Sequence, residues 1–166
     1  MTEVTFLGNP MQVSGNKLKI GDQAPTFELL TNDLSPVQLE TYNGKVKLIS
    51  VVPSLDTEVC DAQTRRFNQE ASQLDHVQLL TISVDLPFAQ KRWCGAQGMD
   101  HVVILSDHRT LSFGKAYGVI LDDLRLLTRA VFVVDSFNTI VYAEYVNEVT
   151  HHPNYIAALE AAKSAK

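Results

Sequence analysis

One stretch of this 166-residue chain, which ends at Cys60, contains residues whose types and spacing could support catalysis. The stretch Pro53-Ser-Leu-Asp-Thr57-Glu-Val-Cys60 follows an apolar segment, 47–52, and precedes a polar segment with helical spacing, 61–74. That order predicts a strand, a tight turn and a helix, with the strand ending at Pro53 because proline lacks a backbone N–H. If Thr57 is the N-cap of the helix, Cys60 occupies its third position.

This position makes Cys60 a candidate nucleophile. The first-turn amides have no partner within a helix, and the helix dipole places partial positive charge there. Both effects stabilise a thiolate, which is the nucleophilic form of cysteine. The alternative is an inert buried cysteine, because Cys60 shares a helical stripe with Phe67, Ala71 and Leu74. Position in the helix is compatible with either role.

A second cysteine, Cys94, lies in another segment with helix signals. A cap-like Asp85 and an early proline predict the start of this helix, and Gly95 and Gly98 are expected to end it. From spacing alone, Cys94 is either a chemical partner of Cys60 or a buried side chain packed beside Trp93.

Composition narrows the class of protein. Hydrophobic residues make up 45% and charged residues 20%, as in globular proteins, and the length suits one domain spanning residues 1–166. A net charge of -5 disfavours nucleic acid as a partner, and no apolar run approaches the roughly 20 residues of a membrane span. The N-terminus lacks the features of a signal peptide, so a cytoplasmic location is expected. Two cysteines in that compartment indicate catalysis or redox sensing more than a structural disulfide.

Strand and helix signals alternate along the chain. Alternating apolar residues and turn dipeptides predict one or two N-terminal β-hairpins within about residues 1–20. Apolar runs predict strands at 26–30, 45–52, 77–84, 102–105, 130–134 and 139–143. Besides the two cysteine-bearing helices, helices are predicted at 111–117 and 154–165. The order predicts an α/β sandwich with a mixed central sheet flanked by helices.

The motif Pro53-x-x-x-Thr57-x-x-Cys60 resembles the active-site motif of the peroxiredoxins, which are thioredoxin-fold peroxidases. The context of Cys94 and the N-terminal hairpin resemble the thiol peroxidase branch, an atypical two-cysteine class. The likeness extends over nearly the whole chain, from Phe6 to the region of Tyr155. It implies a thioredoxin-like fold.

The resemblance also implies roles for individual residues. Cys60 would be the peroxidatic cysteine and Cys94 the resolving one, and the active-site arginine of the family maps onto Arg129. Arg129 would stabilise the thiolate and the oxygen that departs. Thr57 could donate a hydrogen bond to the sulfur or to the peroxide, and Pro53 would pack over the thiolate.

The implied reaction is reduction of hydrogen peroxide or organic hydroperoxides. Cys60 would become a sulfenic acid, and Cys94 would convert it to an intramolecular disulfide that thioredoxin reduces. No cofactor is implied, because cysteine sulfur supplies the electrons. A homodimer is implied as well. Two alternatives stay open: a peroxidase resolved by an external thiol, with Cys94 idle, and a redox sensor that signals through the two cysteines.

Other candidate residues are weaker. An arginine at the head of an apolar strand commonly keeps its charge in water, so Arg129 has a structural interpretation, and Arg125 is its rival. Arg65 and Arg66 suit a solvated helix face. The histidines, His101 among them, show no metal-binding spacing, and the chain contains neither a phosphate-binding glycine loop nor a C-x-x-C motif.

Overall fold

The computed structural model describes residues 2–98 and 102–166, so His101 lies outside the described residues. The strands are β1 (Thr2–Phe6), β2 (Asn9–Ser14), β3 (Glu28–Leu30), β4 (Pro36–Gln38), β5 (Val46–Val51), β6 (Val77–Ser83), β7 (Val103–Ser106), β8 (Ile120–Leu121), β9 (Leu126–Leu127), β10 (Ala130–Val134) and β11 (Ile140–Tyr145). The helices are a 3₁₀ turn, η1 (Leu39–Tyr42), and α1 (Glu58–Ala71), α2 (Pro87–Gln97), α3 (Ser112–Tyr117) and α4 (Tyr155–Ser164).

The main sheet is mixed, as the sequence predicts. Its described strands follow the order β11-β10-β5-β6-β7-β3-β4. Strands β5, β6 and β7 run parallel, and β10 is antiparallel to both β5 and β11. All six residues of β5 are buried, Lys47 and Ser50 among them, and the other four are apolar, as is typical of a central strand.

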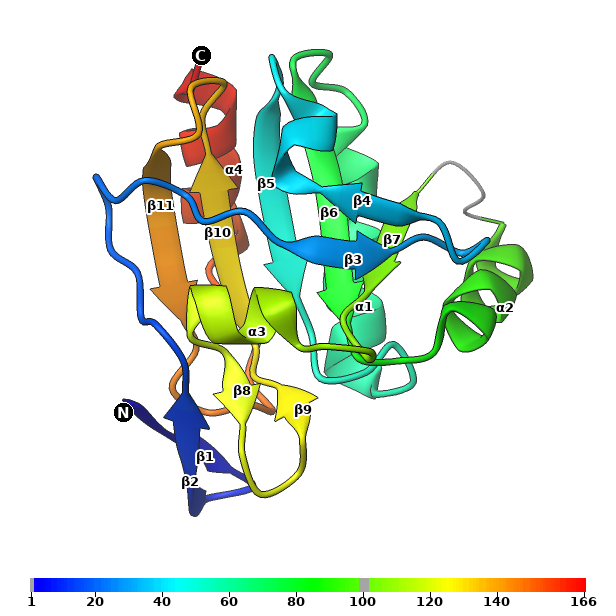
Figure 1. The fold of residues 1–166 in the computed structure, drawn as a ribbon, viewed down its shortest axis with the longest axis vertical. Coiled ribbons are helices and arrows are strands. Elements are labelled where there is room, and N and C mark those ends of the chain that lie inside the picture. Colours follow the sequence, from blue (N-terminus) through cyan, green and yellow to red (C-terminus); the bar gives the residue numbers. More distant parts are fainter. Residues whose placement is uncertain (1, 99–101) are drawn as a thin grey trace.

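Helices cover both faces of this sheet (Figure 1). Helices α1 and α4 lie against one face and α3 against the other. The alternation along β5 divides its side chains between the layers: Val46 and Leu48 pack with α1 and α4, whereas Ile49 and Val51 pack on the side of α3. The chain passes from the end of β5 through a short connection into α1 (Figure 1). Cys60, in the first turn of α1, therefore lies near the carboxyl end of β5.

The N-terminal hairpin is shorter than predicted. Strands β1 and β2 pair through a tight turn at Leu7 and Gly8, both with positive φ, and residues 15–20 form no strand. Asn9 and Pro10, although typical turn residues, begin β2. The hairpin joins β8 and β9 in a second sheet of order β1-β2-β8-β9. Strands β8 and β9 are not predictable from the sequence because two-residue strands carry no periodic signal.

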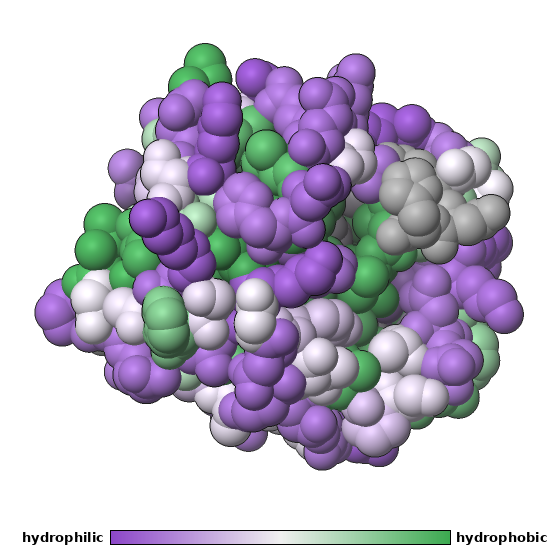
Figure 2. Space-filling model, turned by 90° about the horizontal axis from the view of Figure 1, so that it is seen from above, coloured by the Kyte–Doolittle hydropathy of each residue, from purple (hydrophilic) through white to green (hydrophobic). Residues whose placement is uncertain are grey.

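Helix boundaries also needed correction. Gly95 lies inside α2, and Gly98 alone caps it, with a φ of 67°. Helix α1 ends at Ala71, so Leu74 follows the helix, although it still packs against the core. No helix within the described ranges is long and apolar enough to cross a membrane. Viewed from the end of the sheet where the C-terminus lies, the surface is mainly hydrophilic with scattered apolar areas (Figure 2).

Candidate active site

The connection from β5 to α1 has the form that the sequence predicts. The strand ends at Val51, Pro53 is buried in the turn, and Thr57 is the N-cap of α1 with extended backbone angles. The Cys60 amide donates to Thr57 Oγ1 at 3.3 Å, which makes Cys60 the third helical residue. Local hydrogen bonding thus fixes the sulfur-bearing residue at the positive end of the helix dipole.

The hydroxyl of Thr57 is engaged with the backbone. It accepts from the Cys60 amide and donates to the Ser54 carbonyl at 3.3 Å. The prediction placed this hydroxyl on the sulfur or on the peroxide, whereas its hydrogen bonds in the structure hold the turn and the start of the helix. The hydroxyl nevertheless borders the cavity described below.

Arg129 lies against the Cys60 sulfur. Its Nη2 donates to Cys60 Sγ at 3.2 Å, and the arginine and cysteine are 2% and 0% exposed. The interpretation of Arg129 as a solvated strand-end residue is therefore wrong. Its rival Arg125 is exposed and donates to the His108 carbonyl.

Two further groups fix the guanidinium in place. Arg129 Nε donates to the Val149 carbonyl at 2.7 Å, and Nη1 donates to Gln63 Oε1 at 2.9 Å. The Gln63 amide in turn donates to Ser50 Oγ on β5 at 2.8 Å. The sequence analysis missed Gln63. Its signal was a polar residue one helical turn after Cys60 on the core-facing stripe.

The charge of Arg129 is buried among neutral groups. None of the ion pairs among the described residues includes it, and its hydrogen-bond acceptors are a carbonyl, an amide and the sulfur. A buried cation is costly unless an anion balances it. Among the groups in contact with Arg129, the Cys60 sulfur is the one that could carry a balancing negative charge.

A cavity of about 340 Å³ opens beside this pair. Its walls combine apolar side chains with the polar edge of the active-site turn: Phe6, Pro53, Thr57, Glu58, Val59, Arg129, Val149 and Thr150. Cys60 itself is fully buried, and Arg129, which contacts its sulfur, lies in the cavity wall.

Glu148 fastens the N-terminal hairpin to one wall of the cavity. Its carboxylate accepts from the Gly8 amide at 2.9 Å, the Thr5 hydroxyl at 2.8 Å and the Thr150 hydroxyl at 2.6 Å. The bonds from Thr150, followed by that from Gly8, hold the pKa of Glu148 well below its usual range. These hydrogen bonds hold Phe6 and Thr150, which are far apart in the sequence, in the wall of the same cavity.

Cys94 lies in the last turn of α2. It is 4% exposed and belongs to an apolar cluster with Cys60, Val52, Leu55, Trp93, Val102 and Ile104. No disulfide joins Cys60 to Cys94. The structure therefore brings both predicted cysteines to one region but on separate helices.

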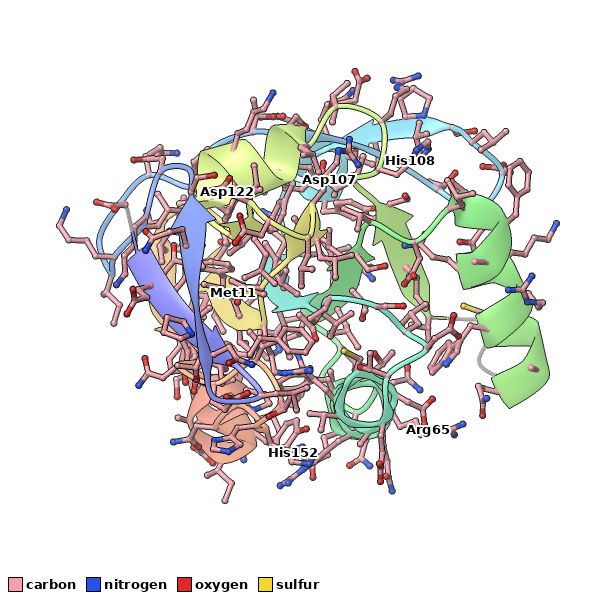
Figure 3. All side chains as sticks on the ribbon, turned by 90° about the horizontal axis from the view of Figure 1, so that it is seen from below. Met11, Arg65, Asp107, His108, Asp122 and His152 are labelled. Carbon is pink, nitrogen blue, oxygen red and sulfur yellow. The ribbon has the colours of Figure 1, made fainter. Side chains whose placement is uncertain are left out.

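The arginine pair on α1 forms a solvated face, as predicted. Arg65 and Arg66 are about half exposed and pair with Asp61 and Glu70, respectively. Arg65 lies on the flank of α1 that faces α2 (Figure 3). Within residues 2–98 and 102–166, no group of three or more His, Cys, Asp or Glu side chains is arranged to hold a metal ion.

The chain is similar to known proteins in sequence and in structure. A sequence profile of the Redoxin family matches residues 19–159. A thiol peroxidase of Halalkalibacterium halodurans is 62% identical over 99% of both chains. A peroxiredoxin-like protein from Aquifex aeolicus has a similar crystal structure, with a TM-score of 0.91 and 36% identity over 97% of this chain and 95% of that one. A thiol peroxidase from Chromobacterium violaceum superimposes with a TM-score of 0.88 over 95% and 93% of the chains; at 23% identity, this likeness concerns the fold.

Proposed function

The chain belongs to the peroxiredoxins, has their thioredoxin-like fold and is a thiol peroxidase. On that premise we propose its complete catalytic cycle. We also propose that residues 1–166 form one domain. Cys60 reduces the peroxide, Cys94 resolves the product as a disulfide, and thioredoxin restores both thiols. The observation that carries the proposal is the 3.2 Å contact between Arg129 Nη2 and Cys60 Sγ, buried beside an open cavity.

The first step is attack on the peroxide. The Cys60 thiolate attacks one peroxide oxygen, the O–O bond breaks, and the other oxygen leaves as an alcohol or water after taking up a proton. Cys60 becomes a sulfenic acid. Arg129 stabilises the thiolate beforehand and the developing negative charge on the departing oxygen during the step, because its donors are already in place. Thr57 fixes the first turn, and Pro53 walls the approach to the sulfur.

The cavity favours organic hydroperoxides in addition to hydrogen peroxide. A volume of about 340 Å³ exceeds what hydrogen peroxide needs, and Phe6, Val59 and Val149 offer apolar surface for an alkyl group. The peroxide head would then lie at the polar end of the cavity, which Thr57 and Arg129 form.

The second step is resolution by Cys94. Its thiol attacks the Cys60 sulfenic acid, a disulfide forms, and water leaves. A disulfide requires Cα atoms about 4.4–6.8 Å apart, a separation that two cysteines on separate regular helices need not have in the reduced protein. We expect the first turn of α1 and the last turn of α2 to unwind. Gly95 and Gly98, which follow Cys94, ease that movement.

The third step returns the enzyme to its starting state. A dithiol protein of the thioredoxin class reduces the Cys60–Cys94 disulfide, so no bound cofactor is needed. Thioredoxin is kept reduced in the cytoplasm, which we propose as the site of action. A homodimer is the expected assembly, and the net charge of -5 gives no reason to expect nucleic acid as a partner.

The test is peroxide consumption coupled to thioredoxin and its reductase. We expect sustained turnover in the wild type and none in Cys60→Ser or Cys94→Ser. The Cys94→Ser enzyme should still consume about one equivalent of peroxide, because its Cys60 remains intact. Sustained thioredoxin-driven turnover in Cys94→Ser would contradict a resolving role, and turnover in Cys60→Ser would contradict the whole assignment.

A further inference from the structure

A hydrogen bond joins the chain neighbours of the two cysteines. Trp93 directly precedes Cys94, and Asp61 directly follows Cys60; the Trp93 indole Nε1 donates to Asp61 Oδ1 at 3.0 Å. Arg65 completes the arrangement, since its Nε donates to the other carboxylate oxygen at 3.0 Å and its guanidinium lies over the Trp93 ring, 5.8 Å from the centroid. Figure 3 shows Arg65 at this boundary between α1 and α2.

This bond lies in a setting where it matters energetically. Trp93 is 8% exposed and the side chain of Asp61 is 36% exposed, so the bond lies at the edge of the buried cluster. Hydrogen bonds to ionised acceptors are stronger than neutral ones, and a buried donor left without a partner is costly. The bond therefore favours the closed packing of α2 on α1.

The other end of α2 is fastened by a separate network. Asp85, just before the helix, accepts from Ser54 Oγ at 2.7 Å and from the Leu55 amide at 2.8 Å, which ties it to the turn before α1. Gln90 on α2 donates to Ser83 Oγ and to the Leu105 carbonyl, each at 3.0 Å. With the start of α2 held in this way, movement of Cys94 is expected at the opposite end, where Trp93 lies.

Helical geometry opposes keeping the bond while the disulfide forms. Adjacent residues on an α-helix point about 100° apart around the axis. While Trp93 faces Asp61, the neighbouring Cys94 points in another direction. We expect that turning Cys94 onto the Cys60 sulfur rotates the segment that carries Trp93 and draws the indole away from the carboxylate.

We propose that the Trp93–Asp61 hydrogen bond is a latch that limits disulfide formation, with both residues acting as positioning residues. The proposal rests on the proposed function above. While the latch is closed, the Cys60 sulfenic acid is held away from Cys94 and remains open to a second peroxide, which would oxidise it to a sulfinic acid and leave as an alcohol or water. Once the latch opens, Cys94 attacks and water departs. The strength of the bond thus sets how the sulfenic acid is divided between the disulfide and the sulfinic acid.

The experiment uses variants that remove one partner at a time. Trp93→Phe removes the donor but keeps a ring, Asp61→Ala removes the acceptor, and Asp61→Asn keeps a weaker neutral acceptor. After a peroxide pulse, rapid quenching, alkylation of thiols and mass spectrometry give the rate of disulfide formation and the sulfinic fraction. We expect disulfide formation to become about tenfold faster in Trp93→Phe and Asp61→Ala, and less so in Asp61→Asn, with a lower sulfinic fraction in each.

Two internal controls sharpen the result. Glu70→Gln breaks the ion pair with Arg66 on the same helix and should change neither quantity. The double variant Trp93→Phe with Asp61→Ala should form the disulfide no faster than the faster single variant, because both changes remove the same bond. Trp93 is the one tryptophan of the chain, so in the wild type its emission should change at the rate of disulfide formation.

The outcomes separate the latch from the cycle on which it rests. If the wild type forms no Cys60–Cys94 disulfide after peroxide, the proposed cycle fails. If the wild type forms it and the Trp93 and Asp61 variants form it at the same rate or more slowly, the latch is refuted while the cycle stands. Additive effects in the double variant would also refute it.

Discussion

The two cysteines offer a controlled comparison within one molecule. Both are buried, and both belong to the same apolar cluster. Cys60 lies in the first turn of α1, where amides and the helix dipole favour negative charge, whereas Cys94 lies in the last turn of α2, where the dipole has the opposite sign. Burial is therefore common to the two cysteines, and the end of the helix on which each lies distinguishes their electrostatic surroundings.

The difference extends to what each sulfur has beside it. Cys60 is in contact with a buried guanidinium that two further groups hold in position. Cys94 lies next to Trp93, whose bond to Asp61 spans two helices, and near Gly98, which caps the helix with a positive φ. In the proposed cycle, the attacking sulfur would need a stabilised anionic state, and the resolving sulfur would need freedom to move.

The largest expected effect comes from removing the charge beside Cys60. Arg129→Gln should slow the oxidation of Cys60 by about 100-fold or more, the scale found when one donor to a developing anion is lost. Single-turnover loss of the Cys60 thiol with peroxide measures this rate. Arg125→Gln, at an exposed arginine in the preceding hairpin, is the matched control. A reduction similar to that of the control would mean that the 3.2 Å contact has no catalytic role.

A buried carboxylate sharpens the comparison because it takes part in none of the ion pairs found within residues 2–98 and 102–166. Asp107 is 1% exposed, and burial raises its pKa from 3.8 to about 6, against hydrogen bonds from the Gly114 and Phe113 amides. Its folded pKa lies above the unfolded one, so its contribution to stability is complete below about pH 4 and is lost as the pH rises through about 6. The loss should amount to roughly 3 kcal/mol of unfolding free energy at most.

Denaturant unfolding of the wild type and of Asp107→Asn, at several values from about pH 3.5 to about pH 7.5, measures that loss. This range covers both ends of the window in which Asp107 titrates. The amide does not titrate, so the difference in unfolding free energy between the two proteins should fall as the pH rises through the window. Asp123→Asn, on an exposed loop, is the control. A difference that is independent of pH would show that Asp107 ionises in the same range in both states.

A smaller effect is expected one layer behind Arg129. Gln63→Leu removes the acceptor of Arg129 Nη1 and should slow Cys60 oxidation by about tenfold, because the guanidinium loses one of the groups that fix its direction. The same single-turnover assay applies. Gln69→Leu, on the exposed face of the same helix, should leave the rate unchanged. Equal rates for the two variants would limit Gln63 to a packing role.

The smallest effect is expected at the helix cap. Thr57→Val removes the acceptor of the Cys60 amide and should cost about 1 kcal/mol of stability, typical of an N-cap. Thr57→Ser keeps the hydroxyl oxygen and should retain most of that stability. Chemical denaturation compares the two. If Thr57→Ser were as destabilised as Thr57→Val, the methyl group and not the cap would be the important feature.

The sequence by itself determined the local part of the site. Pro53, Thr57 and Cys60 lie within a few residues of one another, so proline chemistry, N-capping and helical spacing are enough to predict a strand end, a turn and a first-turn cysteine. The same holds for the buried strands, such as β5 and β6, whose long apolar runs give the α/β class. Two-residue strands such as β8 escaped prediction because their pairing, and not their pattern, defines them.

Only the tertiary structure decided which distant groups meet at the sulfur. Arg129 and Arg125 read alike in the sequence, and sheet pairing of β10 with β5 carries the first of them to Cys60. Gln63 donates a hydrogen bond to Ser50 on the neighbouring strand, and Trp93 donates one to Asp61 on another helix. Such contacts depend on register and packing between elements that are far apart in the chain, which no local propensity encodes.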